Sequence, residues 1–228
     1  MAHAYYHAKS SARKFGGVTE DYVEVHEFMD HTKMHLADCR HRLFLHNTWG
    51  IFLVEKIFGM TLTRSSDGKI VALRPVLEKH VTEDFSFIPT LEECLQTLPR
   101  PSLQLSDDDD MLHSYLSAIS FGGLWSDYLP VHQLLNATRE VLADGRHLRI
   151  LHNAWGITII MRILGTTYVR PSDGVSLSLR PILEQHITKD MGHIPTLQEC
   201  VEGIAIAPWM YRKAYPLSRL QEQSKVSA

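Results

Sequence analysis

Residues 38–51, Asp-Cys-Arg-His-Arg-Leu-Phe-Leu-His-Asn-Thr-Trp-Gly-Ile, return as residues 144–157, Asp-Gly-Arg-His-Leu-Arg-Ile-Leu-His-Asn-Ala-Trp-Gly-Ile. The offset of 106 residues holds without a gap over residues 7–94 and 113–200, and 43 of these 88 paired positions are identical. Self-similarity at a fixed offset indicates a repeated structural unit. We therefore expect a first repeat at residues 1–98, a linker at 99–110, a second repeat at 111–204 and a C-terminal tail at 205–228.

Within each copy the sequence pattern is mostly helical. Residues 4–15 precede a Gly-Gly pair that is typical of a helix end, and apolar residues over 21–46 recur with a period near 3.6, which predicts a continuous helix. Residues 61–63 and 70–73 flank a Ser-Ser-Asp-Gly turn, which predicts a β-hairpin. We predict a mainly α fold: two tandem copies of a small helical domain, each with one short β-hairpin, packed as a pseudo-two-fold dimer.

The composition limits the class of protein. The chain has 228 residues, and its 44% of hydrophobic residues is ordinary for a globular protein. The 23 basic and 26 acidic residues argue against general nucleic-acid binding. Apolar runs stay below the roughly 18 residues of a membrane span, and the N-terminus lacks the pattern of a secretory signal. Three cysteines form a sparse and odd set, so we predict a reducing, cytoplasmic location.

Histidine is the unusual residue type, with 14 in the chain. Five histidines of the first copy recur in the second, whereas none of the first copy's lysines between residues 9 and 79 recurs as lysine. The recurring pairs are His7/His113, His26/His132, His41/His147, His46/His152 and His80/His186. Lysines on a solvated face change freely, so these histidines do not behave like solvated residues, although their recurrence only slightly exceeds the overall identity.

The first candidate constellation is Asp38-x-x-His41, which recurs at Asp144 and His147. A spacing of three places both side chains on one helical face, and carboxylate with imidazole suits zinc, iron, manganese or nickel. His31 and His35 extend this face in the first copy only. The predicted metal ligands are His26, His35, Asp38, His41, His46, Asp144, His147 and His152. The alternative is a structural pair, in which the carboxylate orients a core histidine.

The second constellation is Glu78-x-His80-x-x-x-Asp84, in which the histidine and the aspartate share a helical face. A metal site and a surface pair both fit this spacing. The recurring arginines suit bidentate binding of a phosphate or carboxylate, but they could equally neutralise nearby acidic residues as buried ion pairs. The predicted ligand-binding residues are Arg40, Arg74, His80, Asp84, Arg146, Arg180, His186 and Asp190.

The chain contains no HExxH, Walker, GxGxxG or CxxC motif that would indicate a known chemistry. We hypothesise a His/Asp/Arg cluster that binds a divalent metal, a small anion such as a nucleotide, or both, with metal-dependent hydrolysis as one outcome. The alternative is a non-enzymatic module that binds or sequesters a small molecule or a host protein. The first copy is expected to hold the more complete site, because the second has Val141 and Leu148. The assembly is either a monomeric pseudo-dimer or a homo-oligomer.

Several segments carry a resemblance to known proteins. They are His3-Ala4-Tyr5-Tyr6-His7-Ala8, Phe15-Gly16-Gly17, Ser66-Asp67-Gly68, Ile88-Pro89 and Pro208-Trp209-Met210. In these segments the chain resembles a family of small, histidine-rich bacterial and phage proteins of unknown function, which are single-copy and about half this length. The resemblance implies the domain and its duplication, and it implies no activity.

Overall fold

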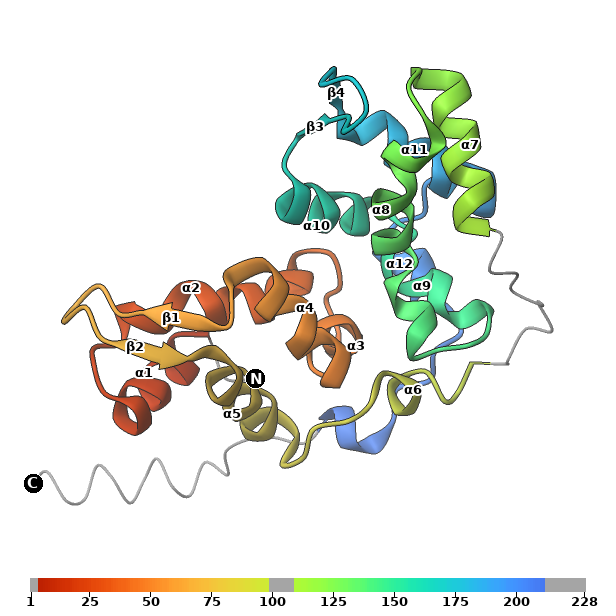
Figure 1. Ribbon diagram of the computed structural model, residues 1–228. Coiled ribbons are helices and arrows are strands. Elements are labelled where there is room, and N and C mark those ends of the chain that lie inside the picture. Colours follow the sequence, from red (N-terminus) through yellow and green to blue (C-terminus); the bar gives the residue numbers. More distant parts are fainter. Residues whose placement is uncertain (1–3, 99–108, 212–228) are drawn as a thin grey trace, which may run out of the picture. The chain divides into compact units, whose positions relative to one another are not determined.

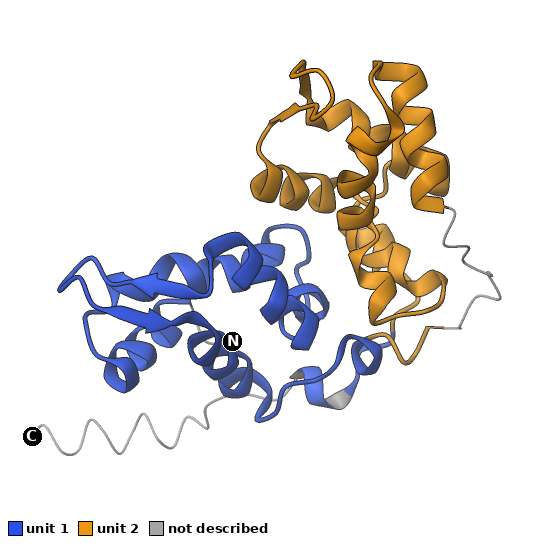
Figure 2. Cartoon of the chain, in the orientation of Figure 1, with its two compact units in different colours: residues 1–94, 205–228 blue, residues 95–204 orange. Residues whose placement is uncertain are grey.

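The computed structural model describes residues 4–98 and 109–211. The chain divides into two compact units, Met1–Cys94 with Ala205–Ala228 and Leu95–Ile204, which Figure 2 shows in different colours. Both units contain the same succession of elements (Figure 1). The chain thus consists of two repeated, mainly α domains with short β-hairpins, as the repeat predicts. Residues 99–108 of the predicted linker and 212–228 of the predicted tail lie outside the described residues.

The first unit consists of short helices and one hairpin. Its elements are α1 (Ala4–Phe15), α2 (Glu20–Met29), the 3-10 helices η1 (His31–Met34) and η2 (Cys39–His41), α3 (Arg42–Leu45), α4 (Thr48–Phe58), β1 (Thr61–Thr63), β2 (Ile70–Ala72), α5 (Leu73–Phe85), α6 (Leu91–Cys94) and, near the end of the chain, the 3-10 helix η5 (Pro208–Tyr211). The strands pair antiparallel, with Leu62 opposite Val71. Helix α5 packs against α1, α2 and α4, so its buried side chains meet those of three other helices.

The second unit repeats this arrangement. Its elements are α7 (Asp109–Phe121), α8 (Trp125–Leu135), η3 (Ala137–Glu140), η4 (Gly145–His147), α9 (Leu148–Leu151), α10 (Ala154–Leu164), β3 (Thr167–Val169), β4 (Ser176–Ser178), α11 (Leu179–Met191) and α12 (Leu197–Cys200). Its strands pair antiparallel with Tyr168 opposite Leu177. Helix α11 takes the place of α5 and packs against α7, α8 and α10.

The hairpin of the first unit is fixed to the helices by polar contacts. Asp21 on α2 accepts a hydrogen bond from the backbone N–H of Ser66 at 3.0 Å. Arg64 donates to the carbonyl of Phe15 at 2.7 Å, at the end of α1. Gly16 makes this approach possible, because its φ is +82° and a Cβ there would lie 2.5 Å from the guanidinium. The same contacts recur in the second unit at Asp127, Ser172, Arg170, Phe121 and Gly122.

A tight junction joins α3 to α4 and determines where His46 lies. The side chain of Asn47 accepts from the backbone N–H of Gly50 at 2.8 Å and donates to the carbonyl of Leu43 at 2.8 Å. A Cβ on Gly50 would lie 2.5 Å from the backbone of Leu45, so only glycine permits this contact. The junction holds His46, which directly follows α3, in the interior of the unit.

The predicted continuous helix over residues 21–46 is wrong, because α2 is followed by two 3-10 helices. Asp38 adopts an extended conformation, and its carboxylate caps η2 by accepting from the backbone N–H of Arg40 at 2.8 Å. The hydroxyl of Thr32 donates to the carbonyl of His41 at 2.7 Å and holds this segment in place. Asp38 and His41 therefore flank a single 3-10 turn, and the predicted shared face of an α-helix does not form.

The two repeated tryptophans, Trp49 and Trp155, are buried in their own units, as expected of core residues. Across the described ranges, each helix is too short or too polar to cross a membrane.

Candidate metal centres

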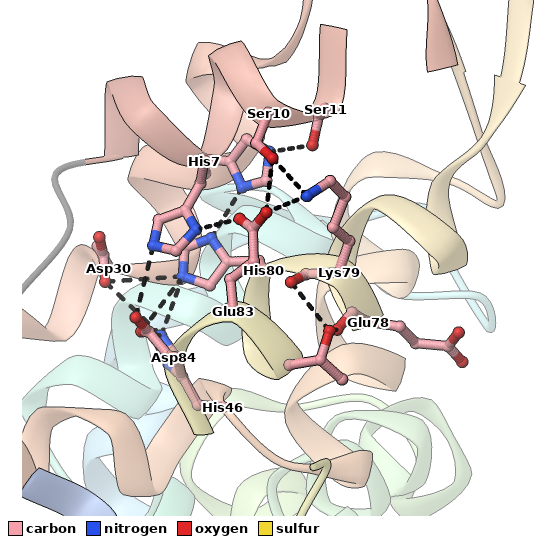
Figure 3. A network of polar contacts seen from close by, with 12 residues as sticks. His7, Ser10, Ser11, Asp30, His46, Glu78, Lys79, His80, Glu83 and Asp84 are labelled. Atoms are coloured by element: carbon pink, nitrogen blue, oxygen red, sulfur yellow. Dashed lines mark hydrogen bonds and ion pairs between the residues drawn. The ribbon is translucent and has the colours of Figure 1, made fainter. Parts of the chain in front are cut away.

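In the first unit, four side chains from three parts of the chain meet in the interior (Figure 3). His80 and Asp84 lie one turn apart on α5, where a spacing of four residues places them on one face. Asp30 lies at the end of α2, and His46 lies at the junction that follows α3. All four residues are buried.

The distances between the four donor atoms are those of a coordination shell. His46 Nε2 lies 3.0 Å from His80 Nε2 and 3.2 Å from Asp84 Oδ2. Asp30 Oδ1 lies 3.7 Å from His46 Nε2 and 3.9 Å from His80 Nε2. A tetrahedral ion with bonds of about 2.0–2.2 Å separates its ligand atoms by about 3.3–3.6 Å. A small divalent ion therefore fits between these atoms with little movement of the side chains.

The two carboxylates of this group are left without well-directed hydrogen bonds. Asp84 forms an ion pair with Arg42 at 3.0 Å, and Asp30 forms one with Lys33 at 2.5 Å. Nevertheless, among the described residues, none of the four carboxylate oxygens has a hydrogen-bond partner. Buried carboxylate oxygens are normally paired with donors or bound to metals. Three of these oxygens still face a cation or an imidazole, whereas Asp30 Oδ1 lies 3.7 and 3.9 Å from the nitrogens of His46 and His80. A bound cation would supply the partner that Asp30 Oδ1 lacks.

The protonation states of the group suit a metal. Burial lowers the pKa of His80 well below its usual value, and the neighbouring imidazoles lower it further. Burial also lowers the pKa of His46. For Asp84, burial acts to raise the pKa, but the nearby imidazoles of His46 and His7 outweigh it and hold that pKa far below its usual range. Neutral imidazoles and ionised carboxylates are the forms that coordinate divalent ions.

A chain of hydrogen bonds runs outward from His80. Its Nδ1 lies 2.8 Å from Nδ1 of His26, and His26 Nε2 lies 2.9 Å from the hydroxyl of Ser11. If Nε2 of His80 binds an ion, the ring keeps its proton on Nδ1 and donates it to His26. His26 then carries its proton on Nε2 and donates to Ser11, so the N–H groups of both imidazoles have an acceptor. Such outer hydrogen bonds are the usual support of a metal-bound histidine.

His7 forms a second layer above the group. Its ring stacks on His80 with centroids 4.1 Å apart, and its two nitrogens lie 2.7 Å from Glu83 Oε2 and 3.5 Å from Asp84 Oδ1. Burial acts to lower the pKa of His7, but the carboxylates of Asp84 and Glu83 outweigh it and raise that pKa to about 9. His7 is therefore a cation at neutral pH and joins the two carboxylates.

The C-terminal segment covers Arg42, which holds Asp84. Arg42 donates to the carbonyl of Met210 at 3.1 Å while it pairs with Asp84. Trp209 packs edge-on against Phe85, with ring centroids 5.0 Å apart, and Phe85 lies 5.2 Å from the guanidinium of Arg42. The first centre is thus closed by side chains and by a segment of chain that follows the second repeat.

The second unit contains a corresponding group of His113, His186 and Asp190. Asp190 Oδ2 lies 3.0 Å from His186 Nε2 and 3.3 Å from His152 Nε2, and its Oδ1 lies 2.8 Å from His113 Nε2. The ring of His113 stacks on His186 at 3.7 Å. The outward chain is also kept, because His186 Nδ1 lies 2.7 Å from His132 Nδ1 and His132 Nε2 lies 3.0 Å from the hydroxyl of Ser117.

Some predicted site residues come together in these groups and others lie elsewhere. His46, His80 and Asp84 meet in the first unit, and His152, His186 and Asp190 meet in the second. His26 supports His80 from behind. The rings of His41 and His147 stand perpendicular to those of His46 and His152, at 6.1 and 5.9 Å, and each donates from Nδ1 to a backbone carbonyl, that of Asp38 or Asp144.

The remaining predicted residues lie outside both groups. The carboxylates of Asp38 and Asp144 are held by Arg40 and Arg146. Arg74 donates to Glu55, and Arg180 donates to Glu184. His35 is exposed at the end of η1. The recurring arginines are thus engaged with carboxylates of their own unit.

Asp30, His7 and His113 are not among the ligands predicted from the sequence. His7 and His113 were visible among the recurring histidines, but no neighbouring carboxylate marked them in the sequence. Asp30 was missed because its counterpart in the second copy is Asn136, so a comparison of identical positions passes over it. A search for Asp paired with Asn between the copies would have found it.

Both repeats match the same protein family, which is described as "Domain of unknown function (DUF6915)", over residues 2–103 and 109–210. The chain belongs to this family. The two matches confirm the duplication and the resemblance found in the sequence. No curated protein and no solved structure gives a significant match to the chain.

Proposed function

We propose that the protein binds divalent transition-metal ions, one in each repeat. In the first repeat the ligands are Asp30, His46, His80 and Asp84. Two imidazoles with two carboxylates suit Zn²⁺, Fe²⁺, Mn²⁺ or Ni²⁺ rather than the soft ions that prefer sulfur. The observation that carries the proposal is the set of four buried donor atoms, which come from three parts of the chain and lie close enough together to bind one ion.

The closed surroundings of the first centre favour a structural role for its ion. All four ligand residues are buried, and Arg42 with the C-terminal segment covers Asp84. Sites whose ligands are all supplied by the protein contribute folding energy, whereas catalytic sites keep a position open. In this reading the ion holds together α2, α5 and the junction after α3, and the repeat acts as a metal-stabilised module.

The direct test is metal analysis of protein purified without an affinity tag. We expect up to two equivalents of a divalent metal, and a lower melting temperature after the metal is removed with a chelator. A protein that carries no metal, and whose melting temperature does not rise with Zn²⁺, Mn²⁺, Fe²⁺ or Ni²⁺, would contradict the proposal.

Two matched substitutions locate the first centre. Asp30→Asn keeps the shape of the side chain but removes one charged ligand, and we expect the metal affinity of the first repeat to fall by at least about tenfold. Asp38→Asn removes a carboxylate that pairs with Arg40 outside the group, and we expect it to leave the affinity unchanged. Competition against a chromophoric chelator measures both, and the reverse order of effects would move the site to the predicted Asp38 cluster.

A further inference from the structure

The two centres differ in their access to solvent. The side chain of Asp84 is 1% exposed, whereas that of Asp190 is 22% exposed. Two substitutions between the repeats accompany this difference. Leu148 stands where the first repeat has Arg42, so the ion pair that covers Asp84 has no counterpart at Asp190. Lys189 stands where the first repeat has Glu83, which reverses a charge next to the aspartate.

Asn136 takes the position of Asp30 in the second unit. Both residues end their helix with nearly the same backbone conformation, φ −93° and ψ 2° for Asp30 and φ −89° and ψ 7° for Asn136. The amide nitrogen of Asn136 donates to Asp110 Oδ1 at 2.5 Å. This contact fixes the orientation of the amide, since only its nitrogen can donate.

The amide oxygen of Asn136 takes no part in the contact with Asp110. Asn136 is 4% exposed, and its Oδ1 has no hydrogen-bond partner among the described residues. Asp30 Oδ1 is a donor atom of the first centre, and Asn136 carries the equivalent side-chain oxygen at the equivalent position, the end of α8. An amide oxygen is a neutral ligand, so the exchange lowers the negative charge of the ligand set by one.

We propose that the second repeat holds an open metal centre, with Asn136, His152, His186 and Asp190 as ligands, that binds a small inorganic or carboxylate anion at its solvent-facing side. This inference rests on the proposed metal-binding function and deepens it. The ligand set supplies one negative charge against two positive charges of the ion. Asp110 lies outside the ligand set and shares the guanidinium of Arg139 with Asp109, at 4.0 and 3.8 Å. In the first centre all four ligand residues are buried, so no side is open.

The experiment uses the full chain loaded with Co²⁺, whose visible absorption reports changes in its ligands, and azide as the anion. We expect two equivalents of Co²⁺ and a saturable change in absorption as azide is added. Asp190→Asn should abolish this change, and the matched Asp84→Asn should preserve it while weakening Co²⁺ binding in the first repeat.

Asn136→Asp combined with Asp110→Asn sharpens the test, because the pair restores the second carboxylate and keeps one donor and one acceptor at the contact between the two side chains. We expect it to tighten Co²⁺ binding and to weaken azide binding by at least about tenfold. Three results would show that the second centre is not open while leaving the metal-binding proposal intact. Two Co²⁺ ions could bind without any change in absorption on addition of azide, the azide response could be lost in Asp84→Asn instead of Asp190→Asn, or it could persist at full strength when Asn136→Asp is combined with Asp110→Asn. Failure to bind Co²⁺ at all would overturn the metal-binding proposal and, with it, this inference.

Discussion

Each buried imidazole of these units has a tautomer that its neighbours determine. His26 illustrates the point, because its Nδ1 meets His80 and its Nε2 meets the fully buried hydroxyl of Ser11. Metal binding to His80 makes the protons along this chain run in one direction, toward Ser11. The hydroxyl is therefore the final acceptor on which the order of the chain depends.

We predict that Ser11→Ala lowers the free energy of unfolding by about 1–3 kcal/mol, since it leaves the N–H of His26 buried without an acceptor. Ser10→Ala is the matched control, because Ser10 is only half-buried and hydrogen-bonds to Glu83 near the surface. Urea denaturation of the metal-loaded protein measures both variants. Equal losses from the two serines would argue against an ordered chain through His26.

At the level of residues, the sequence placed His80 and Asp84 among the ligand-binding residues and left a metal site and a surface pair open for them. Their spacing of four does put them on one face of α5, as the sequence pattern indicates. Their partner His46 was assigned instead to the group of Asp38, because sequence spacing cannot show that the junction after α3 turns its ring toward α5. Asp38 itself looked like a ligand, but a 3-10 turn directs its carboxylate to Arg40.

At the level of elements, the junction between α3 and α4 positions His46. Gly50→Ala would place a Cβ 2.5 Å from the backbone of Leu45, and backbone atoms cannot yield as a flexible side chain can. We predict a loss of at least about 3 kcal/mol in the free energy of unfolding, measured by urea denaturation.

Gly68→Ala serves as the control for that substitution. Gly68 has a φ of +70° but nothing lies within 4 Å of its added Cβ, so only backbone strain of about 1–2 kcal/mol is expected. If Gly50→Ala lowers the free energy of unfolding less than Gly68→Ala does, the prediction is wrong. The junction would then allow α3 and α4 to move apart.

The C-terminal element η5 covers the first centre through Trp209 and Met210. We predict that Trp209→Ala speeds the release of metal from the first repeat several-fold, because its aromatic contacts with Phe85 are worth about 0.5–1.5 kcal/mol. Transfer of the metal to a chelator, followed in time, measures the release. The second repeat lies in the other unit and provides the internal control. Equal acceleration in both repeats would indicate general destabilisation instead of uncovering.

Elements with a strong local pattern were predicted well from the sequence. Helix α1 has the predicted bounds, and the Ser-Ser-Asp-Gly turn lies in the predicted hairpin. The segment after α2 was predicted wrongly. Its apolar spacing continues through η1 and η2, but the cap by Asp38 and the hydrogen bond from Thr32 to His41 end the helix there. Asp38 and Thr32 both act through hydrogen bonds between a side chain and the backbone, which the periodicity of apolar residues does not contain.

At the level of the whole molecule, the many neutral imidazoles make stability depend on pH. Burial lowers the pKa of His26 to about 3 and that of His41 to about 4. The other buried histidines whose pKa is lowered are His46, His80, His132, His147, His152 and His186. Below about pH 6.5 the unfolded chain takes up protons at these positions and the folded chain does not.

We predict that the free energy of unfolding of the metal-free protein falls as the pH is lowered from 6.5 to 5. Each such histidine contributes a slope on the order of 1 kcal/mol per pH unit. His7 acts in the opposite direction, since its raised pKa stabilises the fold fully below pH 6.5 and this contribution is lost as the pH rises through about 9. Urea denaturation from pH 5 to above pH 9 measures both the loss of stability at acidic pH and the loss at alkaline pH. Constant stability between pH 7 and 5 would contradict the neutral, buried state of the histidines.

The most direct measurement of the central claim is anomalous X-ray scattering from crystals of the untagged protein, recorded on both sides of the absorption edge of the bound metal. The account predicts a strong peak within bonding distance of Nε2 of His46 and of His80, with Asp30 and Asp84 completing the shell. Fully occupied crystals with the peak at Asp38 and His41, or metal-soaked crystals without a peak in either unit, would contradict it.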